Sequence, residues 1–149
     1  MLRNLKEIPG YEGFYSMTTT GRVWSHRKER EIFPSLDKSE SRYYLRIALT
    51  DASGKRKTYY HHVLLAMTFI PKHKSEEALE VNHKNFNSLR NHVNNLEWGT
   101  RSENIKHAVL KRKRKTSKDV YLKDLEKIQK QSLKVTATKK KIAARKPKK

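Results

Sequence analysis

No cysteine occurs among the 149 residues, so the sequence excludes disulfide frameworks, cysteine-ligated zinc sites and thiol nucleophiles. Zinc is disfavoured further, because the seven histidines show no HExxH spacing. No apolar run approaches the roughly 18–20 residues of a membrane span, and the start of the chain lacks the apolar stretch of a secretory signal. Hydrophobic residues make up only 35% of the chain, below the roughly 45–50% typical of globular domains. We therefore expect an intracellular protein without a membrane partner, part of which is not packed in a core.

Acidic residues are also scarce, since 15 Asp and Glu stand against 35 Lys and Arg, for a formal charge of +20. Residues 111–149 hold 17 of the basic and only 3 of the acidic residues. Blocks of like charge are typical of arms that bind nucleic acids, because each cation that neutralises a phosphate releases counterions. We therefore predict phosphate contacts, independent of base sequence, from Lys111, Arg112, Lys113 and Arg114. A tail that only aids solubility is the alternative, whereas the lack of Trp and Phe in this segment disfavours a membrane surface.

The basic segment also predicts a helix over about residues 116–133. TSKD at 116–119 fits a capping box, and Tyr121, Leu125 and Ile128 recur at helical spacing. Beyond residue 133 the small residues are scattered and form no apolar stripe, so we expect disorder there.

The first 58 residues are typical of a small β-rich module. Glycine and proline turns separate short runs rich in aromatic and β-branched residues, at 13–17, 22–25, 43–50 and 57–61. In residues 43–50 apolar and polar side chains alternate, which indicates a strand with one buried face. The turn at 51–54 predicts that residues 57–61 return as the second strand of a hairpin.

After residue 61 the pattern changes. HVLLAMTFI at 62–70 is an apolar run that predicts a short buried helix, which Pro71 ends. His61 and His62 are adjacent and invite a metal site, but successive strand residues face opposite ways, so we expect packing or capping roles instead. Residues 79–83 and 95–100 then predict two strands joined by a long loop.

A second helix is expected to begin at Thr100 and to run to about Lys113. Thr100 and Glu103 fit a capping box, which is a signature of a helix start. Ile105, Ala108 and Val109 are spaced as the buried stripe of this helix. The order from residue 79 is therefore strand, loop, strand, helix.

Four polar residues of this segment suit phosphodiester hydrolysis, which needs a base for water and a cation for the phosphate. His83 is a candidate base, because the ordinary pKa of imidazole lies near physiological pH. Asn82 and Asn104 offer amide oxygens to a hard cation such as Mg²⁺. Asn95 would hydrogen-bond the loop backbone and hold the two strands together. Each residue is weak evidence alone, and their joint spacing on strand, strand and helix carries the hypothesis.

These motifs closely resemble the HNH nucleases of the phage and group I intron homing-endonuclease type. Three motifs of the nuclease segment occur in the family's order: VNH at 81–83, NNLEW at 94–98 and SENIKHA at 102–108. IPGYEGFYSMTTTGRVWS at 8–25 looks like the family's N-terminal DNA-binding module, and HHVLLAMTFIP at 61–71 like the helix before the nuclease motif. The resemblance covers residues 5–110.

The resemblance implies an α+β chain with three parts. Residues 1–58 would be the β-rich DNA-binding module, residues 59–110 the ββα-metal (HNH) finger, and residues 111–149 the basic C-terminal helix and disordered tail. The implied activity is metal-dependent hydrolysis of DNA phosphodiester bonds, which leaves a 3′-hydroxyl and a 5′-phosphate. Some members of the family nick only one strand.

The resemblance also implies roles for single residues. His83 corresponds to the general base, Asn82 and Asn104 to the ligands of one divalent ion, and Asn95 to the structural central Asn. The ion would be Mg²⁺, with Mn²⁺ as a substitute. Cations on the strands and on the second helix are candidates for DNA contacts: Arg22, Arg46, Lys55, Arg56, Lys57, Arg101, Lys106 and His107. For the strand cations, a solvated sheet face is the alternative.

Two departures from the family pattern bear on activity. The first metal position is often Asp, whereas Asn82 is neutral, so metal affinity should depend on the substrate phosphate. The loop after the His usually runs I-D-G, but here it is Lys84-Asn85-Phe86, which lacks the glycine best suited to a left-handed turn. Phe86 must therefore pack on the body or face DNA.

Three hypotheses remain open at this stage. The first is an HNH homing endonuclease that acts as a monomer on double-stranded DNA, in the cytoplasm or nucleoid of a phage-infected bacterium. The second is an inactive HNH-like protein that binds nucleic acid, including RNA or a ribosome, for which the lysine-rich tail argues. The third is an unrelated basic structural protein.

Overall fold

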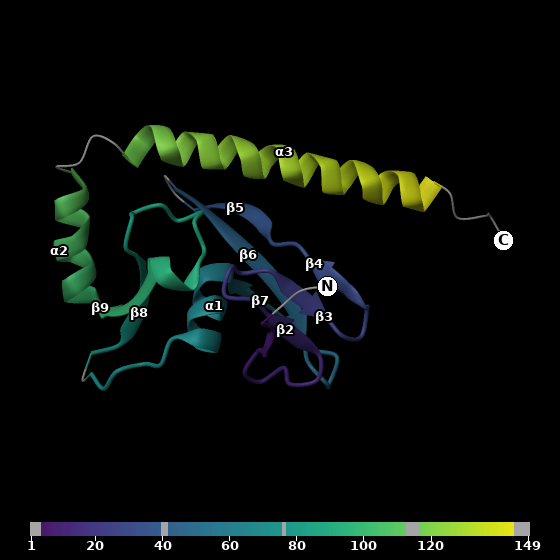
Figure 1. The fold of residues 1–149 in the computed structure, drawn as a ribbon, viewed down its shortest axis with the longest axis horizontal. Helices are drawn as coiled ribbons and strands as arrows, with labels where there is room; N and C mark the ends of the chain where they lie inside the picture. Colours follow the sequence, from purple (N-terminus) through teal and green to yellow (C-terminus); the bar gives the residue numbers. More distant parts are fainter. Residues whose placement is uncertain (1–3, 40–41, 76, 113–116, 145–149) are drawn as a thin grey trace.

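The computed structural model describes residues 4–39, 42–75, 77–112 and 117–144. Within these ranges the chain forms an α+β fold of small antiparallel sheets and helices (Figure 1). The first sheet has the order β1-β2-β3-β4, and its strands are Lys6–Glu7, Tyr15–Met17, Val23–Ser25 and Arg30–Ile32. The second has the order β5-β6-β7, with strands Ser35–Ser39, Arg42–Thr50 and Arg56–Tyr60. The third is the hairpin of β8 (Leu79–His83) and β9 (Leu96–Thr100).

The hairpin of β6 and β7 is confirmed. Its turn is closed by Asp51, whose carboxylate accepts hydrogen bonds from the backbone N–H groups of Ser53 and Lys55 at 3.0 and 2.9 Å. The alternation along β6 buries Leu45, Ile47 and Leu49, as the period of two predicts. Three strands were not predicted, namely β1, β4 and β5. They are short and mostly polar, so pairing with a neighbouring strand defines them rather than a hydrophobic pattern.

Helix α1 (His61–Phe69) lies at the centre of the molecule and contacts β6, β7, β8 and β9. Leu64 and Leu65 are at most 1% exposed and join the core that also contains residues of the first two sheets. The apolar run of this segment is explained by burial on several sides, and each such leucine contributes about 1.5–3 kcal/mol on leaving water. The helix therefore joins the N-terminal module to the β8–β9 hairpin through one core.

The two adjacent histidines begin α1 and are not on a strand, as had been expected for His61. Both are buried, so the predicted packing role is confirmed while the reason given for it is wrong. The helix ends at Ile70, which is extended and precedes Pro71, because a residue before proline avoids the helical region.

The order strand, loop, strand, helix after residue 79 is confirmed. A short turn, η1 (Val93–Asn95), leads into β9, and α2 (Arg101–Arg112) follows at once. The predicted buried stripe of α2 is wrong, however, because Ile105 and Val109 are 58% and 51% exposed. Helical spacing predicts that such residues share a face, but nothing described in the structure packs against that face.

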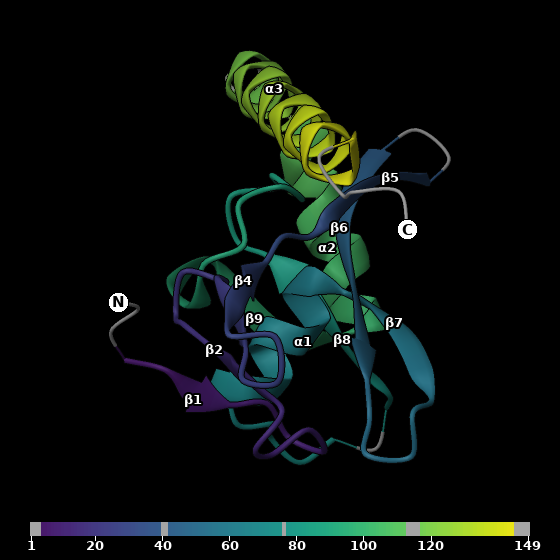
Figure 2. The ribbon, with the colours of Figure 1, turned by 90° about the vertical axis from the view of Figure 1, so that its right-hand side faces the viewer.

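Helix α3 spans Ser117–Ala144 and is longer than expected. Residues 134–144, which were expected to be disordered, are helical, since Lys and Ala favour helix and the first proline after the start of α3 is at position 147. Figures 1 and 2 both show α3 lying across one end of the body, over β5 and the loop that follows β8. The hydroxyl of Tyr121 accepts a hydrogen bond from the backbone N–H of Tyr43 at 3.0 Å, and Asp124 pairs with Arg90 at 2.6 Å.

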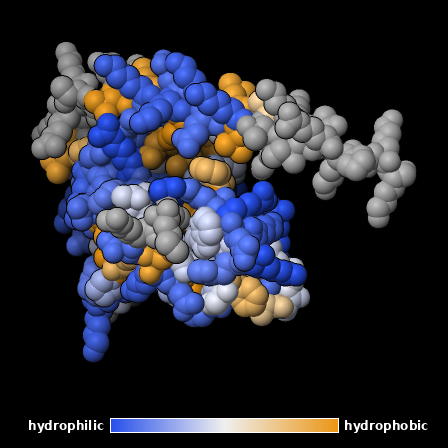
Figure 3. All heavy atoms as spheres, turned by 45° about the vertical axis from the view of Figure 1, so that its right-hand side comes forward, coloured by the Kyte–Doolittle hydropathy of each residue, from blue (hydrophilic) through white to orange (hydrophobic). Residues whose placement is uncertain are grey.

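Figure 3 shows a mostly hydrophilic face, with apolar side chains in orange in its upper part around α3. Exposed apolar residues of this helix include Val120, Leu122 and Leu133. Among the described helices, none is both long enough and apolar enough to cross a membrane.

Candidate functional site

The start of α2 brings Asn104 against strand β8. Thr100 and Glu103 form the predicted capping box: the Thr100 N–H donates to Glu103 Oε2 at 2.7 Å, and the Glu103 N–H donates to Thr100 Oγ1 at 3.2 Å. The first of these bonds holds the pKa of the Glu103 carboxyl below its ordinary value. One residue further on, Asn104 Nδ2 donates to Glu80 Oε2 at 3.1 Å. The cap therefore sets the angle at which α2 meets the strand.

Gly99 makes this close approach possible. It lies opposite Glu80 on β9, and a Cβ there would stand 3.2 Å from Asn104 Oδ1 and 3.4 Å from Glu103 Oε2. A side chain at this position would push Asn104 away from the hairpin. Glycine here serves the approach of a side chain to the backbone rather than an unusual dihedral angle.

Asn82 shares its strand face with Glu80, because residues two apart on a strand point the same way. The structure thus gathers one carboxylate and two amides, from Glu80, Asn82 and Asn104, along one side of the hairpin. Sequence reasoning missed Glu80, although the alternation from Asn82 back along the predicted strand was a sufficient signal. The carboxylate adds a negative charge that the two asparagines lack.

The chemistry of this donor set fits a hard divalent cation. Mg²⁺ prefers oxygen ligands and keeps several waters, so a few oxygen atoms from the protein suffice. Tetrahedral zinc would call for thiolates or several imidazoles. Within the described part of the chain, no three His, Asp or Glu side chains gather in a way that could hold a metal ion. The residues present therefore suit an ion held by amide oxygens, water and a substrate phosphate.

His83 ends β8 and points to the opposite face of the strand from Asn82. It is 7% exposed, its Nε2 lies 2.8 Å from Asn91 Oδ1, and its ring centroid lies 4.9 Å from that of His62. Burial lowers the pKa of the His83 imidazole, the hydrogen bond to Asn91 opposes this shift, and the charge of Arg42 adds to it. The imidazole is therefore neutral at neutral pH, as a general base has to be.

Arg42 is a second residue that sequence reasoning missed. It is exposed at the start of β6, and it is near enough to His83 for its charge to act on the imidazole. No local pattern connects it to a site about 40 residues further along the chain. Only the tertiary fold brings the two residues close to each other.

Asn95 hydrogen-bonds residues of the loop that joins β8 to β9. Its Nδ2 donates to the carbonyl of Arg90 at 2.8 Å and to Asn85 Oδ1 at 3.0 Å, and its Oδ1 accepts from the Asn85 N–H at 3.1 Å. Its own carbonyl accepts from the Lys84 N–H at 2.8 Å. These bonds brace the loop on both sides of its base.

Phe86 packs on α2. Its ring stacks on that of His107 with the centroids 4.1 Å apart and the planes 26° apart. Its φ of +64° lies in the left-handed region, at the position where the family pattern has glycine. Of the two alternatives left open by the sequence, packing on the body is the one observed, and it covers one face of the His107 ring, a residue named as a candidate for DNA contacts.

Two of the expected DNA-binding arginines are held by carboxylates. Arg22 Nε donates to Glu31 at 2.8 Å, and Arg46 Nε lies 3.2 Å from Asp37 while its NH2 donates to the Tyr60 hydroxyl at 2.9 Å. The Arg46 guanidinium also lies over the Tyr60 ring, 4.6 Å from its centroid. Both side chains are therefore already paired within their sheets.

The remaining candidate cations differ in how far the structure describes them. The exposed ones are Lys55, Arg56, Lys57, Arg101 and Lys106. The side chains of Lys111 and Arg112 lie outside the described part of the molecule, as do residues Lys113 and Arg114 altogether.

The chain resembles known proteins both in its N-terminal module and over most of its length. Residues 6–50 match the family model described as the NUMOD4 motif. The chain is 36% identical over 102 residues to DNA endonuclease I-HmuI of Bacillus phage SP01, which covers 68% of this chain and 55% of that protein. It is 37% identical over 106 residues to the uncharacterized HNH endonuclease L247 of Acanthamoeba polyphaga mimivirus, covering 70% of this chain and 25% of that protein. The chain thus spans about half, or only a quarter, of the length of these relatives.

A solved structure gives the same match in three dimensions. It describes DNA binding and cleavage by the HNH homing endonuclease I-HmuI, and it superposes with a TM-score of 0.64 at 31% identity. The superposition covers 83% of this chain and 68% of the other. The similarity therefore includes the β-rich module as well as the hairpin and α2.

Proposed function

Because the chain belongs to the HNH homing endonuclease family, we propose that it is itself a metal-dependent DNA endonuclease. The observation that carries this proposal is that the cap of α2 holds Asn104 against Glu80 of strand β8, the strand that also bears Asn82 and the buried, neutral His83. The substrate is double-stranded DNA, and the site of action is a cell infected by a phage, as for the relative from Bacillus phage SP01.

In this mechanism His83 takes the proton of a water molecule as the water attacks phosphorus. The bond from phosphorus to the 3′-oxygen breaks, this oxygen takes a proton from a solvent water, and the products are a 3′-hydroxyl and a 5′-phosphate. Since Asn82 and His83 lie on opposite faces of β8, the phosphate reaches both only at the end of the strand, where residue 84 begins the loop. Arg42 stands near His83, where a cation favours the phosphate, and Asn95 keeps the loop in place.

Asn82 and Asn104 would hold the divalent ion, with the Glu80 carboxylate beside them. When bound, such an ion polarises the phosphate and stabilises charge on the leaving oxygen. The Glu80 carboxylate by itself would repel a nearby phosphate, and a cation held by Asn82 and Asn104 would offset this repulsion.

Cleavage is expected to require a divalent metal ion. We predict that the full chain converts supercoiled plasmid to nicked or linear DNA with Mg²⁺ or Mn²⁺, and that EDTA reduces the rate to background. A pool of plasmids that carry phage and bacterial genome fragments offers many candidate targets, and gel electrophoresis separates the three forms. Tight DNA binding without cleavage in any metal would instead identify an inactive HNH-like binder, and a parallel assay with RNA tests that alternative.

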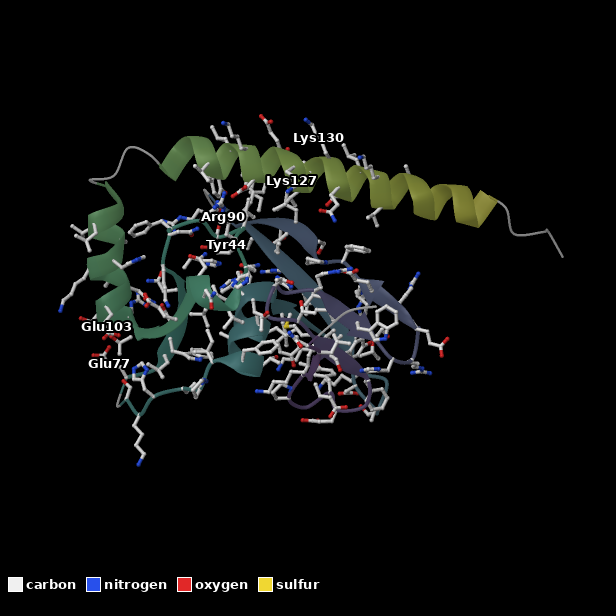
Figure 4. All side chains as sticks on the ribbon, viewed as in Figure 1. Tyr44, Glu77, Arg90, Glu103, Lys127 and Lys130 are labelled. Atoms are coloured by element: carbon white, nitrogen blue, oxygen red, sulfur yellow. The ribbon has the colours of Figure 1, made fainter. Side chains whose placement is uncertain are left out.

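Helix α3 is proposed to bind phosphates through one exposed face. Lys123, Lys127 and Lys130 are spaced i, i+4, i+7, so they share a side of the helix, and all three are exposed. The opposite stripe, with Tyr121 and Asp124, docks on the body. Figure 4 labels Lys127 and Lys130 on α3 and Arg90 beneath it. This arrangement leaves the cations free of the contacts that hold the helix.

Replacing these three lysines by glutamine should weaken DNA binding across all sequences. The slope of log affinity against log salt should fall by about 0.9 for each lysine that contacts a phosphate of B-DNA. Fluorescence anisotropy at several salt concentrations measures it, and Lys6→Gln on β1, far from α3 in Figure 2, serves as control. The cleavage position should stay the same, and a shifted position would show that α3 reads sequence.

A further inference from the structure

A continuous row of hydrogen bonds connects the N-terminal module to His83. The carbonyl oxygen of Gly21 lies 2.6 Å from His61 Nε2, and His61 Nδ1 lies 2.9 Å from Asn91 Nδ2. Asn91 Oδ1 then lies 2.8 Å from His83 Nε2. The three side chains are 3%, 9% and 7% exposed, for His61, Asn91 and His83. Water therefore has little access to the row.

The direction of every bond in this row follows from its first member. A backbone carbonyl can only accept, so His61 Nε2 has to carry the proton. In a neutral imidazole the other nitrogen is then an acceptor, so the amide nitrogen of Asn91 has to face His61. The amide oxygen of Asn91 consequently faces His83 and accepts from its Nε2–H. A neutral His83 is thereby left with its lone pair on Nδ1.

From this geometry we propose that His61 and Asn91 are positioning residues, which hold His83 in the tautomer whose Nδ1 is free to accept a proton from water. The carbonyl of Gly21, in the N-terminal module, sets the tautomer of the base in the nuclease hairpin. The catalytic meaning of this arrangement rests on the endonuclease activity proposed above. The tautomer itself is a property of the folded chain without DNA or metal.

Three further observations support the proposal. Burial lowers the pKa of the His61 imidazole, so that its Nδ1 stays an acceptor. Gly21 has a φ of +82°, and a Cβ there would lie 2.6 Å from His61 Cε1, so the close contact depends on glycine. The ring of His62 packs against that of His83, with the centroids 4.9 Å apart and an angle of 55° between the ring planes. His83 is thus restrained in both ring orientation and protonation.

The row of hydrogen bonds links residues that are 40, 30 and 8 positions apart in the chain. The proposed role of Asn91 differs from a purely structural role in one respect. A structural role depends on volume and on satisfied hydrogen bonds, whereas the proposed role depends on which atom faces His83. Replacement of Asn91 by Asp separates the two, because a carboxylate still accepts from His83 Nε2, although it cannot donate to His61 Nδ1 and introduces a buried charge.

The test is the tautomer of His83 in the full chain, observed by long-range ¹H–¹⁵N correlation NMR at pH 7.5 without metal or DNA. His83→Gln assigns the signal. We expect a protonated Nε2 and an unprotonated Nδ1 at His83 in the wild type. A protonated Nδ1, or a rapid average of the two forms, would overturn the proposal.

Variants of Asn91 give the second readout. Asn91→Ala should shift the His83 signals toward an average of the tautomers and lower the cleavage rate at saturating DNA by about 10- to 100-fold, the usual effect of losing an outer hydrogen-bond partner. Asn91→Asp should keep the Nε2–H signal of His83 and retain more activity than Asn91→Ala. A structural role predicts the reverse order, because a buried carboxylate costs more than a small cavity.

His26→Ala is the matched control, since His26 bonds Ser16 at 2.7 Å in the same module but lies outside the row. It should leave the His83 spectrum and the cleavage rate unchanged. An unaltered His83 spectrum in Asn91→Ala would refute the proposal, even if cleavage fell. If Asn91→Ala fails to fold, the wild-type spectrum and Asn91→Asp still decide. If the wild type gives the expected spectra but does not cleave DNA, the proposed endonuclease function is refuted, whereas the proposed tautomer of His83 stands.

Discussion

Replacing His83 by glutamine should lower the rate of DNA cleavage by about 10²- to 10⁴-fold, the usual contribution of a general base. Glutamine suits this test better than alanine, because its amide can still donate to Asn91 Oδ1, which His83 Nε2 approaches at 2.8 Å. An alanine would leave that buried oxygen without a donor, at a cost of about 1–3 kcal/mol to folding. His83→Gln therefore removes the base while it keeps the hydrogen bond.

Single-turnover cleavage with Mg²⁺ at saturating enzyme measures this effect, because it isolates the chemical step from binding. DNA affinity should change little, since His83 is 7% exposed and contributes no charge at neutral pH. His26→Gln, a change on the surface of the N-terminal module, should cleave at the wild-type rate. A His83→Gln rate within a few-fold of the wild type would remove His83 from the mechanism.

Replacing Gly21 by alanine should reduce the free energy of unfolding by about 2–5 kcal/mol. A left-handed φ of +82° costs about 1–2 kcal/mol for a residue with a Cβ, and forcing a side chain into packed space costs about 1–3 kcal/mol more. The new Cβ would lie 2.6 Å from His61 Cε1 and 3.2 Å from the Asn91 carbonyl oxygen. The His61 side chain cannot move away from this Cβ, because it is 3% exposed and hydrogen-bonded at both ring nitrogens.

Gly54→Ala provides the control for the backbone cost. Gly54 has a φ of +83°, almost the same as Gly21, but a Cβ there meets nothing within 4 Å. Urea unfolding of both variants should give a loss for Gly21→Ala that exceeds the loss for Gly54→Ala by about 1–3 kcal/mol. Equal losses of unfolding free energy in the two variants would show that the His61 side chain moves aside easily. The row of hydrogen bonds would then be less rigid than its geometry indicates.

The parts of the fold that were predicted correctly are those encoded by local patterns. The alternation along β6, the apolar run of α1 with Pro71 after it, and the capping box at Thr100 all involve residues close in sequence. A capping box forms wherever its residues start a helix, whatever the rest of the chain does. The domain boundaries at residues 58 and 110 stay predictions.

The errors concern partners that lie elsewhere in the chain. Ile105 and Val109 were assigned to a buried stripe, but spacing alone does not say whether anything covers a helix face, and they are exposed. The strands β1, β4 and β5 have no apolar signature and exist through their pairing. The extension of α3 to Ala144 includes helix-forming residues whose lack of an apolar stripe had suggested disorder.

The residues of the candidate site also fall into two groups, those that the sequence indicated and those that only the structure revealed. His83, Asn82, Asn95 and Asn104 were selected from their types and spacing, and their catalytic and metal-binding roles remain predictions. Glu80, Arg42 and Asn91 were not selected. They matter through partners on other segments: Glu80 contacts Asn104 of α2, Arg42 acts on His83 from about 40 positions away, and Asn91 bonds His83 and His61.

By itself the sequence determined the charge of the chain, the order of its main elements and the residue types available for hydrolysis of a phosphodiester. Only the tertiary structure decided which atoms of those residues face one another. The physical reason is that hydrogen-bond direction depends on the partner. The carbonyl of Gly21, in the loop before β3, can only accept a hydrogen bond, and that single fact orients an imidazole, an amide and a second imidazole on three other segments.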